Sequence, residues 1–311
     1  MISLANIHAE NNAMSHSPAS SARFYLIDVF AQRPLTGNPL ALVPDADGLA
    51  EAQMRAIARE FNQSETTFLL YPGLPGATWR LRSFTPIGAE VYGAGHNALG
   101  AWLWLAGSGR LASGQDGFAR QIGDEVLPVR VDRAGTRPVV SMDQSAPVFG
   151  ATVEDRAELA GSLGLAEDDL APGIPAQVAG TGASHLMVPV RARAAVDRAQ
   201  PDAARLAAVL AHAGGEGAYL YSLEPGDDDA VAYSRFFNPV MGIAEDPATG
   251  TAAGPLAALL VRSGAAAEGT VVIEQGRALG RPSRIQVSVT GDQVTVSGSG
   301  LVVADGTIRL E

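Results

Sequence analysis

Short apolar runs alternate with amphipathic segments along most of the chain. Runs of about four to eight residues rich in β-branched and aromatic side chains predict strands, whereas apolar residues three and four apart predict a helix. In the segment 50–61, Met54 and Ile57 share one face, which predicts an amphipathic helix. The first half is therefore predicted to contain strands at 24–30, 40–43, 66–71 and 78–84 and helices at 50–61 and 96–106.

The second half repeats this order of elements. The pentapeptide Arg82-Ser-Phe-Thr-Pro86 is matched by Arg235-Phe-Phe-Asn-Pro239, and each stands at a predicted strand end before a glycine-led apolar helix. A matching order of elements over half the chain indicates an internal duplication. Strands are predicted at 177–180, 186–190, 218–223 and 231–237, helices at 202–213 and 251–261, and further alternating strands over 284–311.

The helices predicted at 96–106 and 251–261 are apolar on every side, which indicates that both are buried all round. A buried helix among strands predicts an α+β fold, in which a curved, mostly antiparallel sheet or barrel wraps around a central helix. The duplication makes two such pseudo-symmetric lobes, with a cleft for a small molecule between them. The expected organisation is a disordered N-terminal extension at 1–22, a first lobe at 23–145 completed by the C-terminal strand at about 300–311, and a second lobe at 146–299.

The amino-acid composition limits the catalytic groups and cofactors that the protein can use. The 311 residues include no cysteine, and all 22 basic residues are arginine. Without cysteine there is no disulfide, thiolate nucleophile, iron–sulfur cluster or cysteine zinc site. Without lysine there is no pyridoxal phosphate Schiff base and no P-loop lysine. The histidines are scattered, so we expect no metal and no other cofactor, and we expect carboxylates, hydroxyls and histidines to carry any chemistry.

The net charge and the hydropathy pattern argue against nucleic acids and membranes as binding partners. The net charge is −11 without a basic patch, which argues against nucleic acid. Residues 1–22 lack the basic start and continuous apolar stretch of a signal peptide, and no apolar run approaches the ~20 residues needed to cross a bilayer. We therefore expect a cytoplasmic protein that does not contact a membrane.

Glu65 stands between a predicted helix end and an apolar strand, in the run Asn62-Gln63-Ser64-Glu65-Thr66. A glutamate in that position is often simply solvated. Partial burial at the mouth of a strand would instead raise its pKa and suit it to general acid/base work. The residues alone leave both interpretations open.

Two glycine-led helix starts are candidate anion sites. Gly93-Ala94-Gly95-His96 fits a variant of the dinucleotide-binding fingerprint, but no long buried strand leads into it. Free backbone N–H groups at this start favour an anion such as a substrate carboxylate, whereas His96 is alternatively only a polar cap.

The second start follows Glu245-Asp246-Pro247, where Asp and Pro also form a good N-cap and N1 pair. Gly250-Thr251 occupies the place that Gly95-His96 holds in the first half, so the two starts are expected to converge on one cleft. Glu216 is the repeat equivalent of Glu65, but its flanking glycines indicate an exposed turn, and it is not included in the predicted site.

At these residues the chain resembles the phenazine biosynthesis PhzF-like isomerase family, which shares its fold with diaminopimelate epimerase and proline racemase. The resemblance covers roughly residues 24–310. It is carried by ordered matches in both halves: Asp28-Val29-Phe30, Gly37-Asn38-Pro39, Ser64-Glu65-Thr66, Phe84-Thr85-Pro86, Glu90-Val91, Gly95-His96, Asp246-Pro247-Ala248-Thr249-Gly250-Thr251-Ala252-Ala253-Gly254, Gln275-Gly276 and Arg281-Pro282-Ser283.

The resemblance implies that Glu65 is the proton-transferring carboxylate and that His96 and Asp246 act beside it. It also implies backbone donors at both helix starts, with Thr251 where family members often carry serine. Tyr92 departs from the family pattern and is expected to reshape the pocket. The residues assigned to substrate binding are Ser64, Gly95, Asn97, Gly250 and Thr251.

The function expected from these observations is a cofactor-independent isomerase that moves a proton between carbons of a small carboxylate-bearing substrate. The expected partners are that substrate and a second copy of the chain in a homodimer. Two alternatives remain from the residues: a carboxylate-binding protein without catalysis, and an NAD-dependent oxidoreductase that uses the loop from Gly93 to Gly95.

Overall fold

The computed structural model describes residues 20–93 and 95–310. Residues 1–19, most of the predicted N-terminal extension, lie outside this range. The extension was predicted to end at residue 22, but strand β1 (Ser21–Val29) begins earlier. Ser21 and Ala22 belong to the sheet because they pair with Arg309 and Ile308 near the C-terminus.

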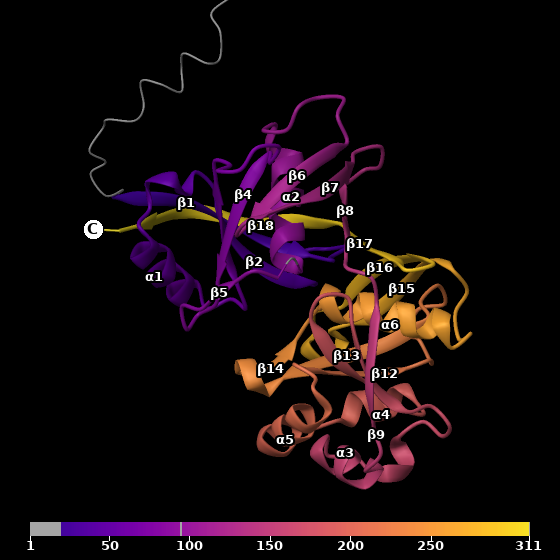
Figure 1. Ribbon diagram of the computed structural model, residues 1–311. Coiled ribbons are helices and arrows are strands. Elements are labelled where there is room, and N and C mark those ends of the chain that lie inside the picture. Colours follow the sequence, from indigo (N-terminus) through magenta and orange to yellow (C-terminus); the bar gives the residue numbers. More distant parts are fainter. Residues whose placement is uncertain (1–19, 94, 311) are drawn as a thin grey trace, which may run out of the picture.

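The first half of the described chain alternates strands with two helices (Figure 1). Its strands pair antiparallel except for the parallel pairs β2–β3 and β4–β6. The elements after β1 are β2 (Asn38–Val43), α1 (Glu51–Phe61), β3 (Thr66–Leu70), β4 (Trp79–Phe84), β5 (Glu90–Val91), α2 (His96–Ser108), β6 (Gly117–Ile122), β7 (Glu125–Asp132) and β8 (Val139–Asp143).

The second half repeats the strand pairings of the first. From β10 to β17 the strands pair in the order and orientations found from β1 to β8, with β11–β12 and β13–β15 as the parallel pairs. The elements are β9 (Val148–Val153), α3 (Arg156–Ser162), β10 (Ala176–Gly180), β11 (Ser184–Pro189), α4 (Arg193–Arg198), α5 (Ala203–Ala213), β12 (Ala218–Ser222), β13 (Ala232–Asn238), β14 (Ile243–Asp246), α6 (Gly250–Arg262), β15 (Gly269–Gln275), β16 (Ser283–Thr290) and β17 (Gln293–Gly298).

The matched pentapeptides play the same part in both halves. Arg82 on β4 makes a two-pronged ion pair with Glu90 on β5, with its Nε 2.7 Å from Glu90 Oε1. Arg235 on β13 does the same with Glu245 on β14, at 2.9 Å. Each ion pair holds a short strand, β5 or β14, against its longer neighbour. Because each short strand leads into the start of a buried helix, the repeated ion pair helps to position both helices.

Helices α2 and α6 lie inside the sheet, as their all-round apolar sequences predicted. Strands β1, β2, β3 and β8 contact α2, whereas β10, β11, β16 and β17 contact α6. A Cβ on Gly100 would lie 2.6 Å from Leu40 and 2.7 Å from Val29, so the missing side chain lets α2 pack closely on β1 and β2. The described strands join into one mixed sheet with helices, which confirms the α+β class.

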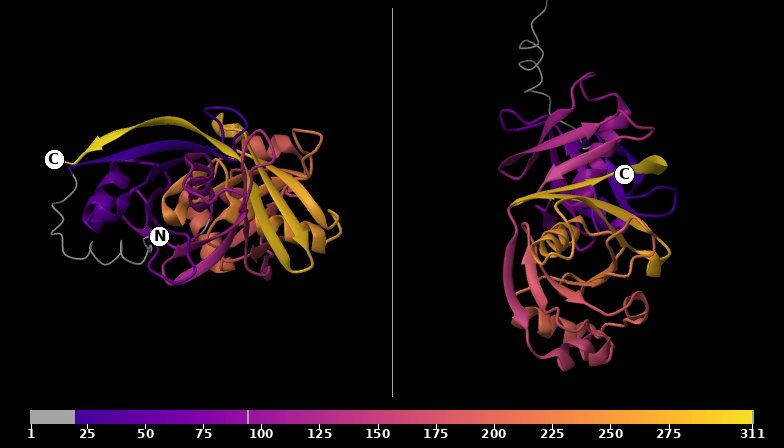
Figure 2. Two further views of the ribbon diagram at one scale, coloured as in Figure 1. Left: turned by 90° about the horizontal axis from the view of Figure 1, so that it is seen from above. Right: turned by 90° about the vertical axis from the view of Figure 1, so that its right-hand side faces the viewer.

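The C-terminal strand β18 (Gly300–Arg309) returns to the first half and pairs antiparallel with β1 along its length (Figure 2). The alternating strands predicted over 284–311 included separate strands at 301–304 and 307–310, which the structure joins into β18. That prediction is wrong: β1 supplies a continuous partner, and a bulge between Leu26 and Ile27 absorbs the irregularity. None of the helices within 20–93 and 95–310 combines the length and apolar character needed to span a bilayer.

Candidate active site

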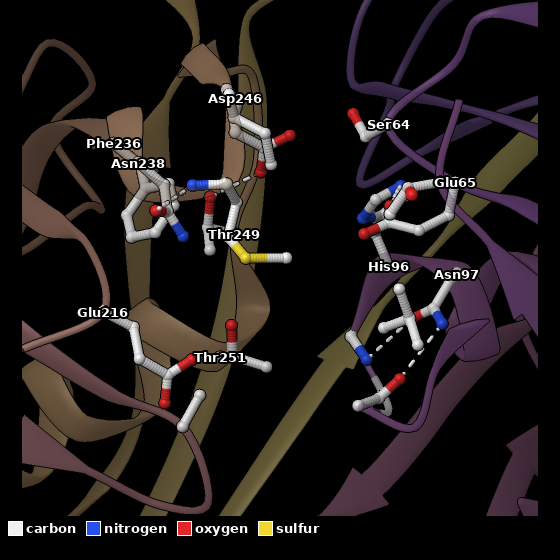
Figure 3. Close-up of a pocket in the computed structure, with 18 of the residues that line it drawn as sticks. Ser64, Glu65, His96, Asn97, Glu216, Phe236, Asn238, Asp246, Thr249 and Thr251 are labelled. Atoms are coloured by element: carbon white, nitrogen blue, oxygen red, sulfur yellow. Dashed lines mark hydrogen bonds and ion pairs between the residues drawn. The ribbon is translucent and has the colours of Figure 1, made fainter. Parts of the chain in front are cut away.

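A cavity of about 590 Å³ lies between the two halves of the chain (Figure 3). All the predicted site residues line it, and they come from loops and helix starts of both halves: Ser64, Glu65, Gly95, His96, Asn97, Asp246, Gly250 and Thr251. The two helix starts are close, because a Cβ on Gly95 would lie 3.7 Å from Thr251 Cγ2. The predicted convergence of the starts on one cleft is therefore what the structure shows.

Glu65 lies in the turn that joins α1 to β3. Asn62, in the left-handed conformation, ends α1 and directs the chain back toward the sheet. The Glu65 side chain is only 17% exposed. Its burial, together with the negative charge of Asp246, raises the pKa of the carboxyl to about 8. At neutral pH most Glu65 side chains are therefore protonated.

His96 is the first residue of α2 and contacts Glu65. Its Nε2 is 3.2 Å from Glu65 Oε2. The alignment is not that of a hydrogen bond, and neither atom has another partner among the described residues. Burial lowers the pKa of His96 to about 4, so the imidazole is neutral at pH 7. A neutral imidazole beside a protonated carboxyl leaves both groups available to a substrate.

Asp246 ends β14 on the opposite wall. Its Oδ1 accepts a hydrogen bond from Asn38 Nδ2 at 2.9 Å, and its Oδ2 accepts one from Thr249 Oγ1 at 2.5 Å. Burial raises the pKa of Asp246 to about 6, and hydrogen bonds from Thr249, Asn38 and Ser64 oppose that rise. Asp246 is therefore ionised at neutral pH while Glu65 is not.

A buried glutamine holds the Asp246 wall in place. Gln275 Nε2 donates to the Asp246 carbonyl at 2.7 Å and to Thr249 Oγ1 at 3.1 Å. Its Oε1 accepts from Tyr219 OH and from the Thr249 N–H, each at 3.0 Å. With every polar atom of its amide used, Gln275 fixes the rotamers of the groups that face the cavity. Sequence reasoning had assigned it no role beyond the family resemblance.

Asn97 and Gly95 have roles that differ from those predicted. The Gly95 N–H, predicted to bind a substrate anion, donates to Asn97 Oδ1 at 2.9 Å. Asn97 Nδ2 donates to Ser83 Oγ and the Gly93 carbonyl. The asparagine thus orders the loop before α2, and an anion would have to displace it to reach the Gly95 N–H. At α6, Gly250 and Thr251 precede the first intrahelical bonds, which Ala252 and Ala253 donate to Thr249.

The structure also corrects two interpretations of single residues. Tyr92 is not among the lining residues; its side chain is 63% exposed, and its ring lies beside Gly123, so it does not shape this cavity. Glu216 was excluded as part of an exposed turn, and it is exposed, but its side chain lies on the cavity wall. Its repeat equivalence to Glu65 was the signal in the sequence that favoured including it. His185, Phe236 and Asn238 also line the cavity. Phe236 and Asn238 belong to the repeated pentapeptide 235–239, which was used only as a sign of duplication, and no pattern in the sequence singled out His185.

The loop at Gly93 does not have the context of a dinucleotide site. Strand β5, which leads into it, has two residues and pairs antiparallel with β4. A dinucleotide fingerprint follows a parallel strand of a βαβ unit. Within the described parts of the chain, no three histidine, aspartate or glutamate side chains form a group that could hold a metal ion.

Comparisons with known proteins agree with this geometry. A family model described as phenazine biosynthesis-like protein matches residues 27–306. The trans-2,3-dihydro-3-hydroxyanthranilate isomerase of Pseudomonas chlororaphis is 36% identical over 300 residues, which cover 92% of this chain and 99% of the relative. The uncharacterized isomerase YddE of Escherichia coli K12 is 36% identical over 293 residues, covering 90% and 95%.

A solved structure agrees over the same length. The Bacillus anthracis phenazine biosynthesis protein of the PhzF family matches with a TM-score of 0.88 at 28% identity, over 94% of this chain and all of that one. The sequence relatives place the chain among enzymes, in the isomerase class. It belongs to the phenazine biosynthesis-like (PhzC–PhzF) family.

Proposed function

We propose that the protein moves a proton between two carbons of a small carboxylate-bearing substrate, with Glu65 as the only acid and base and without a cofactor. The observation that carries the proposal is the Glu65 carboxyl itself: largely buried in the cavity, with a pKa raised to about 8 and a neutral imidazole 3.2 Å away. A carboxyl with a pKa near the working pH both accepts and returns a proton readily.

In the proposed reaction the ionised Glu65 takes a proton from a substrate carbon. The electron pair of that C–H bond shifts the double bond, and Glu65 returns the proton to another carbon on the same face. Neutral His96 and ionised Asp246 orient the polar groups of the substrate. The substrate carboxylate binds at the start of α6, where the N–H groups of Gly250 and Thr251 precede the first intrahelical bonds and the helix dipole favours negative charge.

We further infer that the chain is built of two pseudo-symmetric lobes, as the duplication predicted. The equivalent pairing series β1–β8 and β10–β17 support this inference, as do the equivalent Arg82–Glu90 and Arg235–Glu245 pairs. The divisions after residues 145 and 299 remain proposed, as do the homodimer and the cytoplasmic location.

Exchange in D₂O tests the proposed reaction. The protein is incubated in D₂O with trans-2,3-dihydro-3-hydroxyanthranilate, the substrate in the name of the Pseudomonas relative, or with a panel of amino- and hydroxy-carboxylates. The reaction should introduce deuterium at a carbon of the substrate, and NMR measures its incorporation. Exchange should persist in EDTA and disappear in Glu65→Gln. Binding without exchange would show a carboxylate-binding protein instead.

NADH titration tests the oxidoreductase alternative. Titration monitored by fluorescence should show no binding; saturable binding would favour the oxidoreductase.

The pH dependence gives a second test. Because proton removal needs the ionised form of Glu65, kcat/KM should rise with pH and level off above about 8. The charge of Asp246 helps to raise that pKa, so Asp246→Asn should move the midpoint to lower pH as well as slow turnover. Rate profiles from pH 5 to 10 for both proteins measure the shift. A midpoint that stays in place would contradict the assigned coupling between the two carboxyl groups.

A further inference from the structure

The Asp246 carboxylate receives a hydrogen bond from the other half of the chain. Asn38, the first residue of β2, is buried, and its Nδ2 donates to Asp246 Oδ1 at 2.9 Å and to the Ala248 carbonyl at 2.8 Å. Its Oδ1 is buried and has no partner among the described residues. The Asn38 amide therefore acts only as a donor, and both of its N–H groups are directed at the wall that carries Asp246.

Strand β2 connects this contact to Glu65. Ala41, three residues after Asn38, pairs in parallel with Thr66, the residue that follows Glu65. At about 3.3 Å per residue, the two contacts lie about 10 Å apart along the same strand. Glu65 and Asp246 stand on opposite walls of the cavity and come from different halves of the chain (Figure 3). Because β2 contacts both segments, it fixes the separation of the two carboxyl groups.

The turn before Asn38 is anchored to the second half by an arginine. Arg281 Nη2 donates to Asp28 Oδ1 at 2.6 Å. Its Nη2 and Nε also donate to two backbone carbonyls of the turn, those of Thr36 at 2.9 Å and Gly37 at 2.8 Å. These bonds hold the Asn38 backbone in place against the segment that follows β15, so the side chain reaches the Asp246 wall from a fixed position.

The charged and titratable groups around Asp246 do not replace the bond from Asn38. They come from the α1–β3 turn and from β12, β13 and β14: Glu65, Tyr219, Arg235 and Glu245. The carboxyl groups of Glu65 and Glu245 disfavour a second negative charge beside them. Arg235 is engaged by Glu245, and burial raises the pKa of Tyr219, so the phenol is neutral. Hydrogen bonds, that from Asn38 among them, therefore stabilise the charged form of Asp246.

We propose that Asn38 is a positioning residue, which holds the Asp246 carboxylate in its charged form and at a fixed separation from Glu65. Asn38 is absent from the described lining of the cavity, so it acts through Asp246 and not on the substrate. The inference rests on the proposed function for the part that Asp246 plays in turnover, but the ionisation of Asp246 can be measured without a substrate.

Urea unfolding at pH 5 and pH 7.5 tests the effect of Asn38→Leu on the charge of Asp246. Loss of the hydrogen bond should raise the pKa of Asp246 further above its value in the unfolded chain, so the variant loses more stability than the wild type as the pH rises. The urea midpoint of Asn38→Leu should therefore lie further below the wild-type midpoint at pH 7.5 than at pH 5. In an Asp246→Asn background, the same substitution should lower the midpoint equally at both pH values.

The pH profile of kcat/KM tests the positioning role in turnover. The wild type should show a lower break near the Asp246 pKa of about 6, below which the rate falls more steeply. Asn38→Leu should move that break up by about one pH unit, a tenfold change in the ionisation constant, as expected for loss of a hydrogen bond to a charged group. Asp246→Asn should remove the break. A merely structural role would lower the rate at every pH and leave the break in place.

Thr36→Val is the matched control, because Thr36 is also buried and its Oγ1 donates to the Arg33 carbonyl within the same turn, at 2.7 Å. It should lower the urea midpoint equally at both pH values and keep the wild-type break. Asn38→Ala, which lacks the bulk of leucine, is a second variant and should show the pH dependence of Asn38→Leu.

Two results would overturn the inference. One is an equal fall of the urea midpoint at both pH values in the folded Asn38 variants, and the other is a pH-dependent fall that persists in the Asp246→Asn background. A wild type that shows no proton exchange, together with the pH-dependent fall in Asn38→Leu, would contradict the proposed function and support the role of Asn38 in holding the Asp246 charge.

Discussion

Glu65→Gln should reduce turnover by more than the factor of ~10²–10⁴ that one general acid or base usually contributes. The loss is expected to be larger because no second proton carrier is proposed. The amide retains the shape of the side chain and cannot exchange a proton. Steady-state rates measure the loss. Glu60→Gln, on the exposed side of α1, is the control and should keep full activity. A variant that kept more than a tenth of wild-type activity would exclude Glu65 as the base.

The same variant should be more stable than the wild type at alkaline pH. The pKa of Glu65 is raised from 4.5, the value expected in the unfolded chain, to about 8 in the folded protein. Between these two pH values the unfolded chain releases the proton first, so the free energy of unfolding falls as the pH rises. Glutamine carries no charge and avoids this loss, on the order of 3–5 kcal/mol when complete. Urea unfolding at pH 5 and pH 9 should show a gain only at pH 9. A gain equal at both values would contradict a buried ionisable Glu65.

Gly276→Ala should destabilise the fold by about 3–5 kcal/mol and also lower activity. Gly276 has φ of +83°, and a Cβ there would lie 2.4 Å from the Arg281 carbonyl oxygen and 2.5 Å from that of Pro247. Both obstacles are backbone, so they cannot rotate away. Pro247 follows Asp246 directly, and its displacement would disturb the cavity wall around Asp246.

Gly280→Ala provides a matched comparison in the same turn. Gly280 has φ of +68° and no atom within 4 Å of a Cβ. The Gly280→Ala variant should lose only about 1–2 kcal/mol of stability, which is the cost of placing alanine in the left-handed conformation, and it should keep its activity. Urea unfolding and steady-state rates of both variants separate backbone strain from close contact. Equal losses would show that the contacts at Gly276 relax freely.

The long apolar and amphipathic segments were predictable because their pattern reflects burial. Helices α1, α2, α5 and α6 begin and end within two residues of the predicted bounds. Helices α3 and α4 are only a turn or two long, too short for a periodic signal to stand out. Strand β9 is mostly exposed and so lacks the alternation that identifies a strand.

Within the site, the residues at the ends of helices and strands were predictable, because neighbouring residues in the sequence determine where those elements begin and end. Glu65, His96 and Asp246 each stand at an element boundary that the sequence displays. Glu216 and His185 reach the cavity through the pairing of β11 with β12, a contact between segments distant in the chain. A single sequence does not reveal such a contact, which is why an exposed turn and a cavity wall were not distinguished.

The pairing of β1 with β18 has a consequence for synthesis. As the chain leaves the ribosome, β1 meets β2 at once, but its other edge finds its partner only after residues 300–309 have emerged. An unpaired strand edge readily associates with other chains. Because this contact spans almost the whole sequence, it closes slowly during folding. Nascent chains stalled before residue 300 should therefore be the species that chaperones retain, and a folding reporter on β1 should respond only after residues 300–309 have emerged.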